Sequence, residues 1–337
     1  MRDEKGTRRK PRRKFRRRSA VAQFLYHARY RIAEFALRGF VAILPWVPLR
    51  ALSLCTRAAA WLTFGCLWRY RRRMAQNIDL AMARDLAAPE RKALLWRAWN
   101  NFARGVLETG VVVHFTKERI LRFVGIEEED HLKRALSKGK GVIALSAHLG
   151  AFTLIGPRLA AAGYPFSVVV KHPGDARFAR LLDQYRARLG IATISARPRR
   201  EAARGILKAL RQKRIVLVIA DEFKSGGLMV DFLGRPSPAP RGPATLALRT
   251  GAPAVPIFAP RRPDGSPVVK IGEEVEVARS DDVEQSVAAT TRIFTRHLED
   301  AVRRYPDQWN WLGFGSGEPS VKRRRKRRRP KVSSRSA

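Results

Sequence analysis

The chain has 337 residues, 45% of them hydrophobic, which is enough for one large α/β domain or two ordinary ones and excludes a chain that is disordered throughout. Its 68 basic residues outnumber 29 acidic residues, for a net charge of +39 at pH 7. Such a charge indicates a polyanionic neighbour, either nucleic acid or an anionic lipid surface.

Much of this charge lies at the two ends of the chain. Residues 1–18 carry a net charge of +9, residues 320–337 carry +10, and the 301 residues between them carry the other +20. Because blocks of like charge repel one another and stay solvated, we predict a basic disordered arm over 1–31 and a basic disordered tail over 316–337. The folded body between them is basic as well.

Residues 32–68 form a densely apolar segment. Aromatic and basic side chains are interleaved along it: Trp46, Trp61, Trp68, Arg38, Arg50 and Arg57. No uncharged stretch approaches the roughly 20 residues needed to cross a bilayer. We therefore predict a membrane-associated helical hairpin, broken near Pro45 and Pro48, with the arginines reaching toward the headgroups. The alternative is a pair of helices buried in a soluble protein. Basic residues beside the segment would keep the N-terminal arm cytoplasmic, and no cleavable signal peptide is expected.

From residue 69 to residue 315 the pattern predicts one α/β domain. Apolar residues recur at three and four positions over about 70–120, which predicts a long helical region. Beyond it, apolar runs typical of buried strands alternate with segments of helical periodicity. The predicted strands are 142–146, 166–171, 191–195, 215–220, 228–234, 253–258 and a polar stretch near 267–277. The predicted helices are 154–163, 176–190, 200–212, 243–251 and 281–304, with a Pro-rich turn over 236–243.

Strands that are apolar throughout are buried on both faces, and strands that alternate with helices form a largely parallel sheet between helices. The expected fold class is therefore α/β, a mostly parallel central sheet flanked by helices, preceded by the apolar helical segment. Ligands bind such sheets at the carboxyl ends of the strands. This rule selects residues 146–150, 171–175 and 221–227.

The residues at these strand ends include groups that can transfer protons. His148 follows the first buried strand, where an imidazole can act as a general base near neutral pH. Asp221 and Glu222 follow the fourth strand, where they could act in catalysis, orient a base or simply be solvated. The cations near the end of the second strand could bind a phosphate or carboxylate, or equally serve as surface charges: Lys171, His172 and Arg186.

Several other chemistries are not supported by the spacing. Ser146 lacks the Gly-x-Ser-x-Gly pattern of a hydrolase nucleophile. The GKG at 139–141 lacks the spacing of a phosphate-binding loop. Cys55 and Cys66 have neither metal-ligand nor redox spacing and are expected as small buried side chains. No metal site and no organic cofactor are expected.

Blocks spread over roughly 40–312 resemble a known family: SAHLGAF, VVVKHP, LLDQYRARLG, VIADE, VDFLGRPSPAPRGPATLALRTGAPAVPIF and RYPDQWNWL. In order and spacing they are similar to the bacterial lipid A biosynthesis acyltransferases, of the lysophospholipid-acyltransferase-like superfamily, which include the mycobacterial phosphatidylinositol mannoside acyltransferases. The resemblance implies transfer of a fatty acyl chain from an acyl carrier protein or coenzyme A thioester. The acceptor would be a hydroxyl of a glycolipid or phospholipid at the cytoplasmic face of the inner membrane.

The family carries a His followed five positions later by Asp or Glu. The resemblance implies that His148 takes the proton of the acceptor hydroxyl, but the position of the acid holds Thr153. A Thr hydroxyl cannot supply the charge that stabilises an imidazolium. Three outcomes follow: another acid, either Asp221 or Glu222, approaches the ring; or the enzyme is slow; or the fold serves a non-catalytic purpose.

The resemblance also implies a set of substrate-binding residues. Lys171 stands where the family often has Arg, so a bidentate contact would become a point charge. The full expected set is Lys171, Arg186, Thr153, Phe232, Gly234, Arg235 and Gly242.

The function expected from the sequence is O-acyl transfer, with the thioester donor, the lipid acceptor and an anionic membrane surface as partners. The alternative is a catalytically impaired family member that binds membranes or lipids. Nucleic acid is not the expected partner, because the chain shows no recognition-helix motif, zinc spacing or aromatic RNA-binding string.

Overall fold

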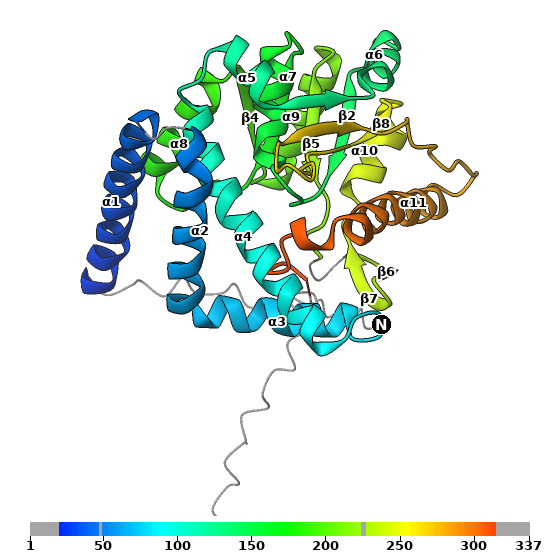
Figure 1. The fold of residues 1–337 in the computed structure, drawn as a ribbon. Coiled ribbons are helices and arrows are strands. Elements are labelled where there is room, and N and C mark those ends of the chain that lie inside the picture. Colours follow the sequence, from blue (N-terminus) through cyan, green and yellow to red (C-terminus); the bar gives the residue numbers. More distant parts are fainter. Residues whose placement is uncertain (1–19, 47–48, 224–226, 315–337) are drawn as a thin grey trace, which may run out of the picture.

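The computed structural model describes residues 20–46, 49–223 and 227–314, and Figure 1 shows their arrangement. The expected tail over 316–337 and residues 1–19 of the expected arm lie outside this range. Helix α1 (Ala20–Ile43) begins inside the expected arm, so the prediction of disorder over 20–31 is wrong. Aromatic packing contributes to this order, since the Tyr30 ring lies 5.8 Å from the Phe178 ring of helix α8 (Ala176–Arg188).

The central sheet confirms the predicted α/β class. Within the described residues it has seven strands, in the order β1 (Gly125–Glu127), β9 (Val268–Ile271), β8 (Ala254–Phe258), β2 (Val142–Ser146), β5 (Ile215–Ile219), β3 (Phe166–Val170) and β4 (Ile191–Ser195). Neighbouring strands run parallel except β8 and β9, which are antiparallel. The sheet is therefore mostly parallel, and its central strands are the apolar runs of the sequence.

Helices cover both faces of this sheet. They are α6 (Glu129–Ser137), α7 (Ile155–Ala161), α8, α9 (Arg199–Arg211), α10 (Gly242–Thr250) and α11 (Val283–Arg304). Every residue of β2 is buried, because successive side chains enter opposite cores. Ile143 and Leu145 join the core that α9, α10 and α11 cover, whereas Val142 and Ala144 join the core that α6 and α7 cover. Burial on both faces is the physical reason for a continuous apolar run.

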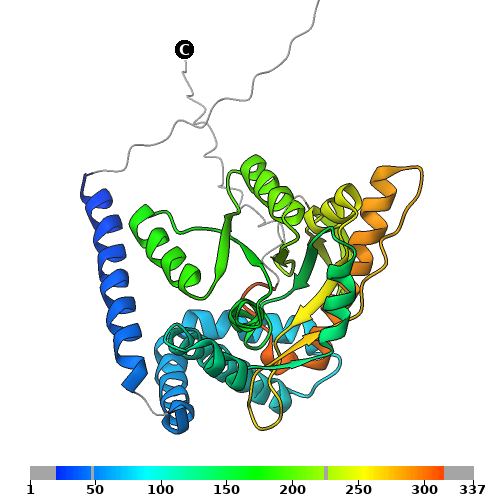
Figure 2. The ribbon, with the colours of Figure 1, turned by 90° about the horizontal axis from the view of Figure 1, so that it is seen from above.

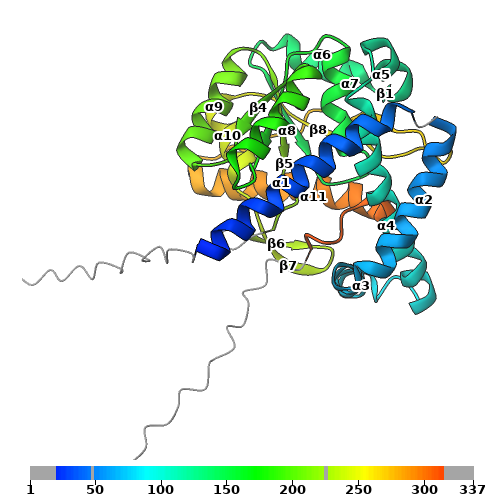
Figure 3. The same ribbon diagram turned by 90° about the vertical axis from the view of Figure 1, so that its left-hand side faces the viewer.

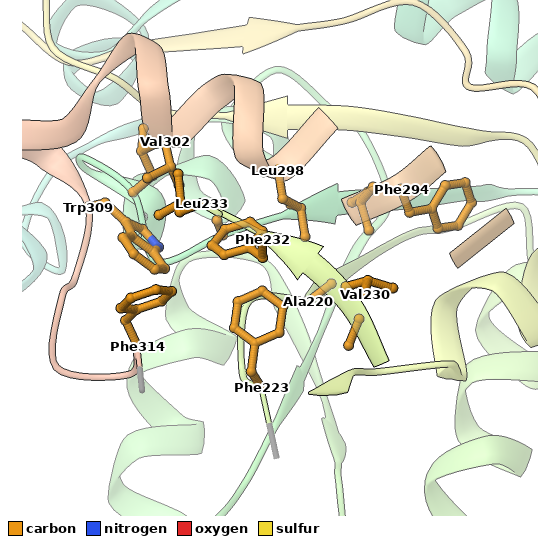
Figure 4. Close-up of a cluster of buried hydrophobic side chains, with 14 of the residues drawn as sticks. Ala220, Phe223, Val230, Phe232, Leu233, Phe294, Leu298, Val302, Trp309 and Phe314 are labelled. Carbon is orange, nitrogen blue, oxygen red and sulfur yellow. The ribbon is translucent and has the colours of Figure 1, made fainter. Parts of the chain in front are cut away.

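The Pro-rich segment after residue 235 is a strand, not the predicted turn. Strands β6 (Leu228–Phe232) and β7 (Arg235–Ala239) form an antiparallel hairpin closed by Leu233 and Gly234, which have φ values of 55° and 71°. Counting from such a two-residue turn, hydrogen-bonded residue pairs alternate with pairs that are not hydrogen-bonded. Pro236 and Pro238 therefore occupy positions where the ladder needs no N–H. Figure 4 shows Val230, Phe232 and Leu233 of this hairpin packed beside Phe294, Leu298 and Val302 of α11.

The predicted helical region over 70–120 is divided into three helices: α3 (Trp68–Met82), α4 (Ala88–Val112) and α5 (Lys117–Phe123). The break before α4 was not predicted; there Pro89 lies in the first turn and Glu90 accepts a hydrogen bond from the Ala87 N–H at 2.7 Å. Strand β1 and helix α6 were not predicted either. The short strand β1 has no apolar run to mark it.

The apolar N-terminal segment is a pair of helices, as predicted. The chain turns between α1 and α2 (Leu49–Cys66) through the 3-10 helix η1 (Leu44–Trp46), and residues 47–48 are not described. Figures 1 and 2 show α1 at the outer edge of the molecule, and in Figure 3 it lies in front of the rest of the domain. Helix α2 packs against α4. In the described ranges, no helix combines the length and the apolar character that crossing a membrane requires.

Many large apolar side chains of α1, η1 and α2 face solvent, which contradicts the alternative of two buried helices. They are Phe24, Leu25, Ile32, Phe35, Ile43, Trp46, Leu54, Trp61 and Leu62, and the exposed fraction reaches 81% at Phe35 and 86% at Trp46. Cys55 and Cys66 are exposed as well, so their predicted burial is wrong. A face of this kind is larger than scattered surface hydrophobes account for, and it indicates an interaction surface.

Ion pairs connect α1 to the body of the protein. Glu34 of α1 is buried and lies 3.0 Å from Arg177 of α8. Arg31 of α1 lies 2.8 Å from Asp175, which caps α8 by accepting from the Phe178 N–H. This N–H and the guanidinium of Arg31 hold the pKa of Asp175 down, at about 2, against the opposing effect of burial. The outer helix is thus attached partly through charge, while the exposed apolar side chains named above face outward.

A close approach of two strand ends fixes the loop after β2. Gly150 has a φ of 60°, and a β carbon there would lie 2.2 Å from the carbonyl oxygen of Ala259, beyond the end of β8. Only glycine fits this position without movement of the backbone. The same contact holds the next residue, since the Ala151 N–H donates to the Ala259 oxygen at 2.7 Å.

We expect Gly150→Ala to lower the free energy of unfolding by about 3 kcal/mol, the combined effect of left-handed backbone strain and overpacking. Gly139→Ala is the matched control, because Gly139 has a φ of 71° and open space around it. It should lose only about 1 kcal/mol, from strain alone. Urea denaturation of both variants measures the difference, and equal losses would mean that the contact with Ala259 is unimportant.

Candidate active site

The register of the sheet brings two of the predicted residues together. Ser146 of β2 pairs with Ile219 of β5, and the Ala220 N–H donates to the Ser146 oxygen at 2.9 Å. His148 and Asp221 each lie two residues beyond this pair, so they leave the sheet side by side. Ser146 itself is fully buried, which agrees with its rejection as a nucleophile.

The Asp221 carboxylate binds His148 through both of its oxygens. Oδ1 lies 2.8 Å from the ring nitrogen Nδ1, and Oδ2 accepts the backbone N–H of the same residue at 2.8 Å. The indole N–H of Trp309 also donates to Oδ2, at 2.8 Å. The carboxylate thus fixes the ring and the backbone of one residue at the same time.

The charge of Asp221 sets the state of the ring. Asp221 is 3% exposed, and burial opposes its negative charge, but the hydrogen bonds from His148 and Trp309 outweigh this effect and hold its pKa below 3.8. Asp221 is therefore ionised at neutral pH and accepts a hydrogen bond from the Nδ1–H of His148. In neutral His148 the proton then resides on Nδ1 and the lone pair on Nε2, the arrangement of a general base.

A segment from the far end of the domain holds the loop that carries His148. The Asn310 N–H donates to the His148 oxygen at 2.9 Å, and the Gly150 N–H donates to the Gln308 oxygen at 2.8 Å. Trp309 between them is 1% exposed and packs against Phe232, as Figure 4 shows. The residues after α11, beginning with the 3-10 helix η3 (Pro306–Gln308), therefore complete the site.

A cavity of about 250 Å³ opens beside the His148 ring, whose side chain is 29% exposed. The lining of the cavity is mainly apolar and includes a few polar side chains. The lining residues are Ala98, Phe102, Gly105, Val106, Thr109, His148, Gly150, Phe152, Thr153, Gln308, Trp309 and Asn310. One wall is a single stripe of α4, since positions 98, 102, 105, 106 and 109 share a helix face. The Phe152 ring packs edge-on against His148, with ring centroids 5.0 Å apart.

Of the two candidate acids, Asp221 makes these contacts with the ring, whereas the side chain of Glu222 is exposed. The residue at the family's acidic position, Thr153, lines the cavity and hydrogen-bonds to Thr109 at 2.6 Å. The sequence alone named both acids without choosing between them. The register of β2 and β5 makes the choice.

The predicted cations lie together at the end of β3 but not in the wall of this cavity. Asp183 lies 2.9 Å from the His172 ring and 2.7 Å from Arg186, so it offsets part of the charge of Arg186. Lys171 is exposed. These side chains form a separate basic cluster on the surface.

The other predicted substrate-binding residues occupy the β6–β7 hairpin and α10. Phe232 is fully buried and packs between Phe223 and Trp309. Gly234 closes the hairpin with a positive φ, Arg235 begins β7 and Gly242 begins α10. These four residues are not in the cavity wall, and Phe232 supports Trp309 from behind.

Most of the residues that build the cavity were not predicted from the sequence. Trp309, Asn310 and Gln308 belong to the RYPDQWNWL block, which carries part of the family resemblance, and the α4 stripe shows helix periodicity that does not mark a cavity. The small residues Ala98 and Gly105 within that stripe were the available signal. In the described part of the chain, no group of His, Cys, Asp and Glu is arranged to hold a metal ion.

Comparison with known proteins gives concordant matches. The family described as bacterial lipid A biosynthesis acyltransferase matches residues 21–313. A phosphatidylinositol mannoside acyltransferase of Mycolicibacterium smegmatis is 27% identical over 54% of this chain and 59% of its own length, which is less than two thirds. In Escherichia coli K12, a lipid A biosynthesis palmitoleoyltransferase is 25% identical over 85% of this chain and 91% of its own length. A lauroyltransferase of that pathway is 23% identical over 72% and 79%.

We expect Asp221→Asn to lower the free energy of unfolding at pH 7 by about 2–3 kcal/mol, because a buried acceptor of three N–H groups loses its charge. The folded-state pKa of Asp221 is depressed below 3.8, so its contribution is present above that value and lost as the pH falls through the folded pKa. The difference from the native chain should therefore persist down to pH 4 and shrink only below it.

Urea denaturation across this pH range measures both quantities. Glu222→Gln changes an exposed acid and should alter stability by less than about 0.5 kcal/mol. A larger loss in Glu222→Gln than in Asp221→Asn would reverse the assignment of the two acids.

Proposed function

The chain belongs to the bacterial lipid A biosynthesis acyltransferase family, and we propose that it transfers a fatty acyl chain from an acyl carrier protein or coenzyme A thioester to a hydroxyl of a glycolipid or phospholipid. The observation that carries this proposal is the His148–Asp221 pair beside a mainly apolar cavity. An imidazole with an ionised orienting carboxylate is suited to activate an alcohol, and an apolar cavity is suited to take a fatty chain.

In the proposed mechanism, Nε2 of His148 takes the proton of the acceptor hydroxyl as its oxygen attacks the thioester carbonyl carbon. The new ester forms when the carbon–sulfur bond breaks, and the imidazolium returns the proton to the thiolate that leaves. Asp221 does not take up the proton. It keeps the ring in the Nδ1–H tautomer and stabilises the positive charge of the imidazolium, as the carboxylate does in serine proteases.

The α4 stripe gives the acyl chain a surface to follow. Phe102 and Val106 are partly exposed at the cavity. Gly105 allows α4 to approach the loop after β2 closely, since a β carbon at position 105 would lie 3.7 Å from the Gly150 oxygen. The proposed path of the chain runs along this stripe, away from His148. Burial of each methylene there contributes about 0.8 kcal/mol.

The alternative, a family member without catalysis, was motivated by Thr153 at the position of the family's acid. The contacts of Asp221 remove most of that motive, since an ionised carboxylate lies 2.8 Å from Nδ1 of His148. Activity is therefore the better-supported reading.

We also propose that the protein works at the cytoplasmic face of the inner membrane, attached by α1 and α2. Their exposed aromatic side chains suit the interface of a bilayer, and the net charge of +39 suits anionic lipids. Because α2 packs on α4, this attachment would bring the cavity wall close to the lipids that supply the acceptor.

His148→Ala should lower the rate of acyl transfer about 1,000-fold, because the general base is lost. Asp221→Asn should lower it at least 100-fold through loss of the tautomer and the countercharge. The measurement follows transfer from palmitoyl-coenzyme A and palmitoyl-acyl carrier protein to a panel of glycolipids and lysophospholipids. His297→Ala, on α11, is the control and should retain the native rate. A folded native chain without transfer to any acceptor would contradict the proposed activity.

Replacing Phe35, Trp46 and Trp61 by Ala should weaken binding to vesicles of phosphatidylglycerol about 100-fold, because three large apolar side chains no longer insert. The control replaces Leu80, Met229 and Val283, which are also exposed but lie outside α1 and α2. Co-sedimentation measures both. Equal losses would place the membrane contact elsewhere.

A chain without residues 1–18 and 320–337 separates lipid binding from nucleic-acid binding. The charge of these tails gives DNA binding that does not depend on the DNA sequence and weakens with salt. Removal of the tails should abolish this DNA binding and leave vesicle binding through α1 and α2. Tight DNA binding after the deletion would favour a nucleic-acid function instead.

A further inference from the structure

Two threonine hydroxyls lie in the wall of the His148 cavity and form a short chain of hydrogen bonds. Oγ1 of Thr109 on α4 donates to the Gly105 carbonyl oxygen, one turn earlier, at 2.6 Å. Oγ1 of Thr153 lies 2.6 Å from Oγ1 of Thr109. Both residues line the cavity together with His148.

The proton count fixes the direction of this chain. A hydroxyl has one proton to donate and lone pairs that accept. The proton of Thr109 is used on the Gly105 carbonyl, which cannot donate in return. The bond between the two hydroxyls must therefore be donated by Thr153. With its own proton committed, the exposed oxygen of Thr153 can only accept a hydrogen bond from a group in the cavity.

This polarity restricts what Thr153 can bind. A thioester carbonyl and a fatty acyl chain carry no N–H or O–H, so neither can donate to it. The attacking hydroxyl of the acceptor has a single proton, and in the proposed mechanism that proton goes to Nε2 of His148. A ligand group that bonds to Thr153 must therefore be an additional donor.

We propose that Thr153 accepts a hydrogen bond from a second hydroxyl of the acceptor, so that the acceptor presents a polyol, such as a sugar ring or a glycerol, rather than a single alcohol. This inference rests on the proposed function and names the substrate class of the same site. Thr153 then acts as a positioning residue, which holds the polyol so that its neighbouring hydroxyl reaches His148.

Other polar side chains of the cavity wall form hydrogen bonds with the backbone. Oδ1 of Asn310 accepts from the Leu312 N–H at 3.2 Å. The amide of Gln308 is bound on both sides to the backbone of Arg261, at 2.7 and 3.3 Å. The hydroxyl of Thr153 differs from these groups: its oxygen is exposed to the cavity, and its own proton is donated to Thr109, so it can accept a hydrogen bond from a ligand.

The test compares two small acceptors that differ by one hydroxyl, 1,2-hexanediol and 1-hexanol. For the full-length native chain and for Thr153→Val, dissociation constants are measured by NMR titration without a thioester. The ratio of kcat/KM for the two acceptors is measured with palmitoyl-coenzyme A. Thr153→Val keeps the shape of the side chain and removes the acceptor oxygen.

We expect the preference for the diol over the alcohol to fall about 5- to 10-fold in Thr153→Val, the effect of one net hydrogen bond. Thr153→Ser should keep the preference, because it retains the hydroxyl. Thr245→Val is the control, since Thr245 makes a similar bond to the Arg241 oxygen, at 2.9 Å, but lies on α10 outside the cavity wall.

An unchanged ratio in Thr153→Val would overturn the inference, as would an equal loss for both acceptors, which would make Thr153 part of the cavity shape alone. A higher KM for palmitoyl-coenzyme A with an unchanged ratio would assign the hydroxyl to an amide of the donor and also overturn it. Failure of the native chain to transfer to either acceptor would count against the proposed function, whereas the binding ratio would still decide the role of Thr153.

Discussion

The carboxylate of Asp221 is the point on which the candidate site depends. It is buried, and it keeps its charge because three N–H groups surround it: the ring and backbone of His148 and the indole of Trp309. A charge in this position would otherwise be costly. The same three bonds join the end of β2, the end of β5 and the segment after α11, so the electrostatics of the site and the packing of the domain support each other.

Most of the sheet could be predicted from the sequence, because buried parallel strands are apolar throughout. The site was predicted less completely. The carboxyl-end rule selected His148, Asp221 and Glu222, but choosing between two adjacent acids requires the register of β2 against β5, which apolar runs do not encode. Strand β7 was missed because its prolines signal a turn, and only the hairpin partner shows that their missing N–H groups are not needed.

The cavity wall could not be predicted for a similar reason. Its residues come from α4, from the loop after β2 and from the segment after α11, and only the folded chain brings these together. The start of α1 was missed because the basic arm dominates the local charge. Two ion pairs hold α1 against α8: Glu34 of α1 with Arg177, and Arg31 of α1 with Asp175. The partners in each pair are more than 140 positions apart in sequence.

The position of Trp309 near the end of the folded domain has a consequence for biosynthesis. A ribosome completes β2 and β5 long before it adds the indole that donates to Asp221. Until then the carboxylate lacks one of its donors, and the loop of His148 lacks the backbone bond from Asn310. A nascent chain, or one truncated shortly after α11, therefore holds both members of the pair without the hydrogen bonds from Trp309 and Asn310, so the order of translation delays completion of the candidate site until the domain is whole.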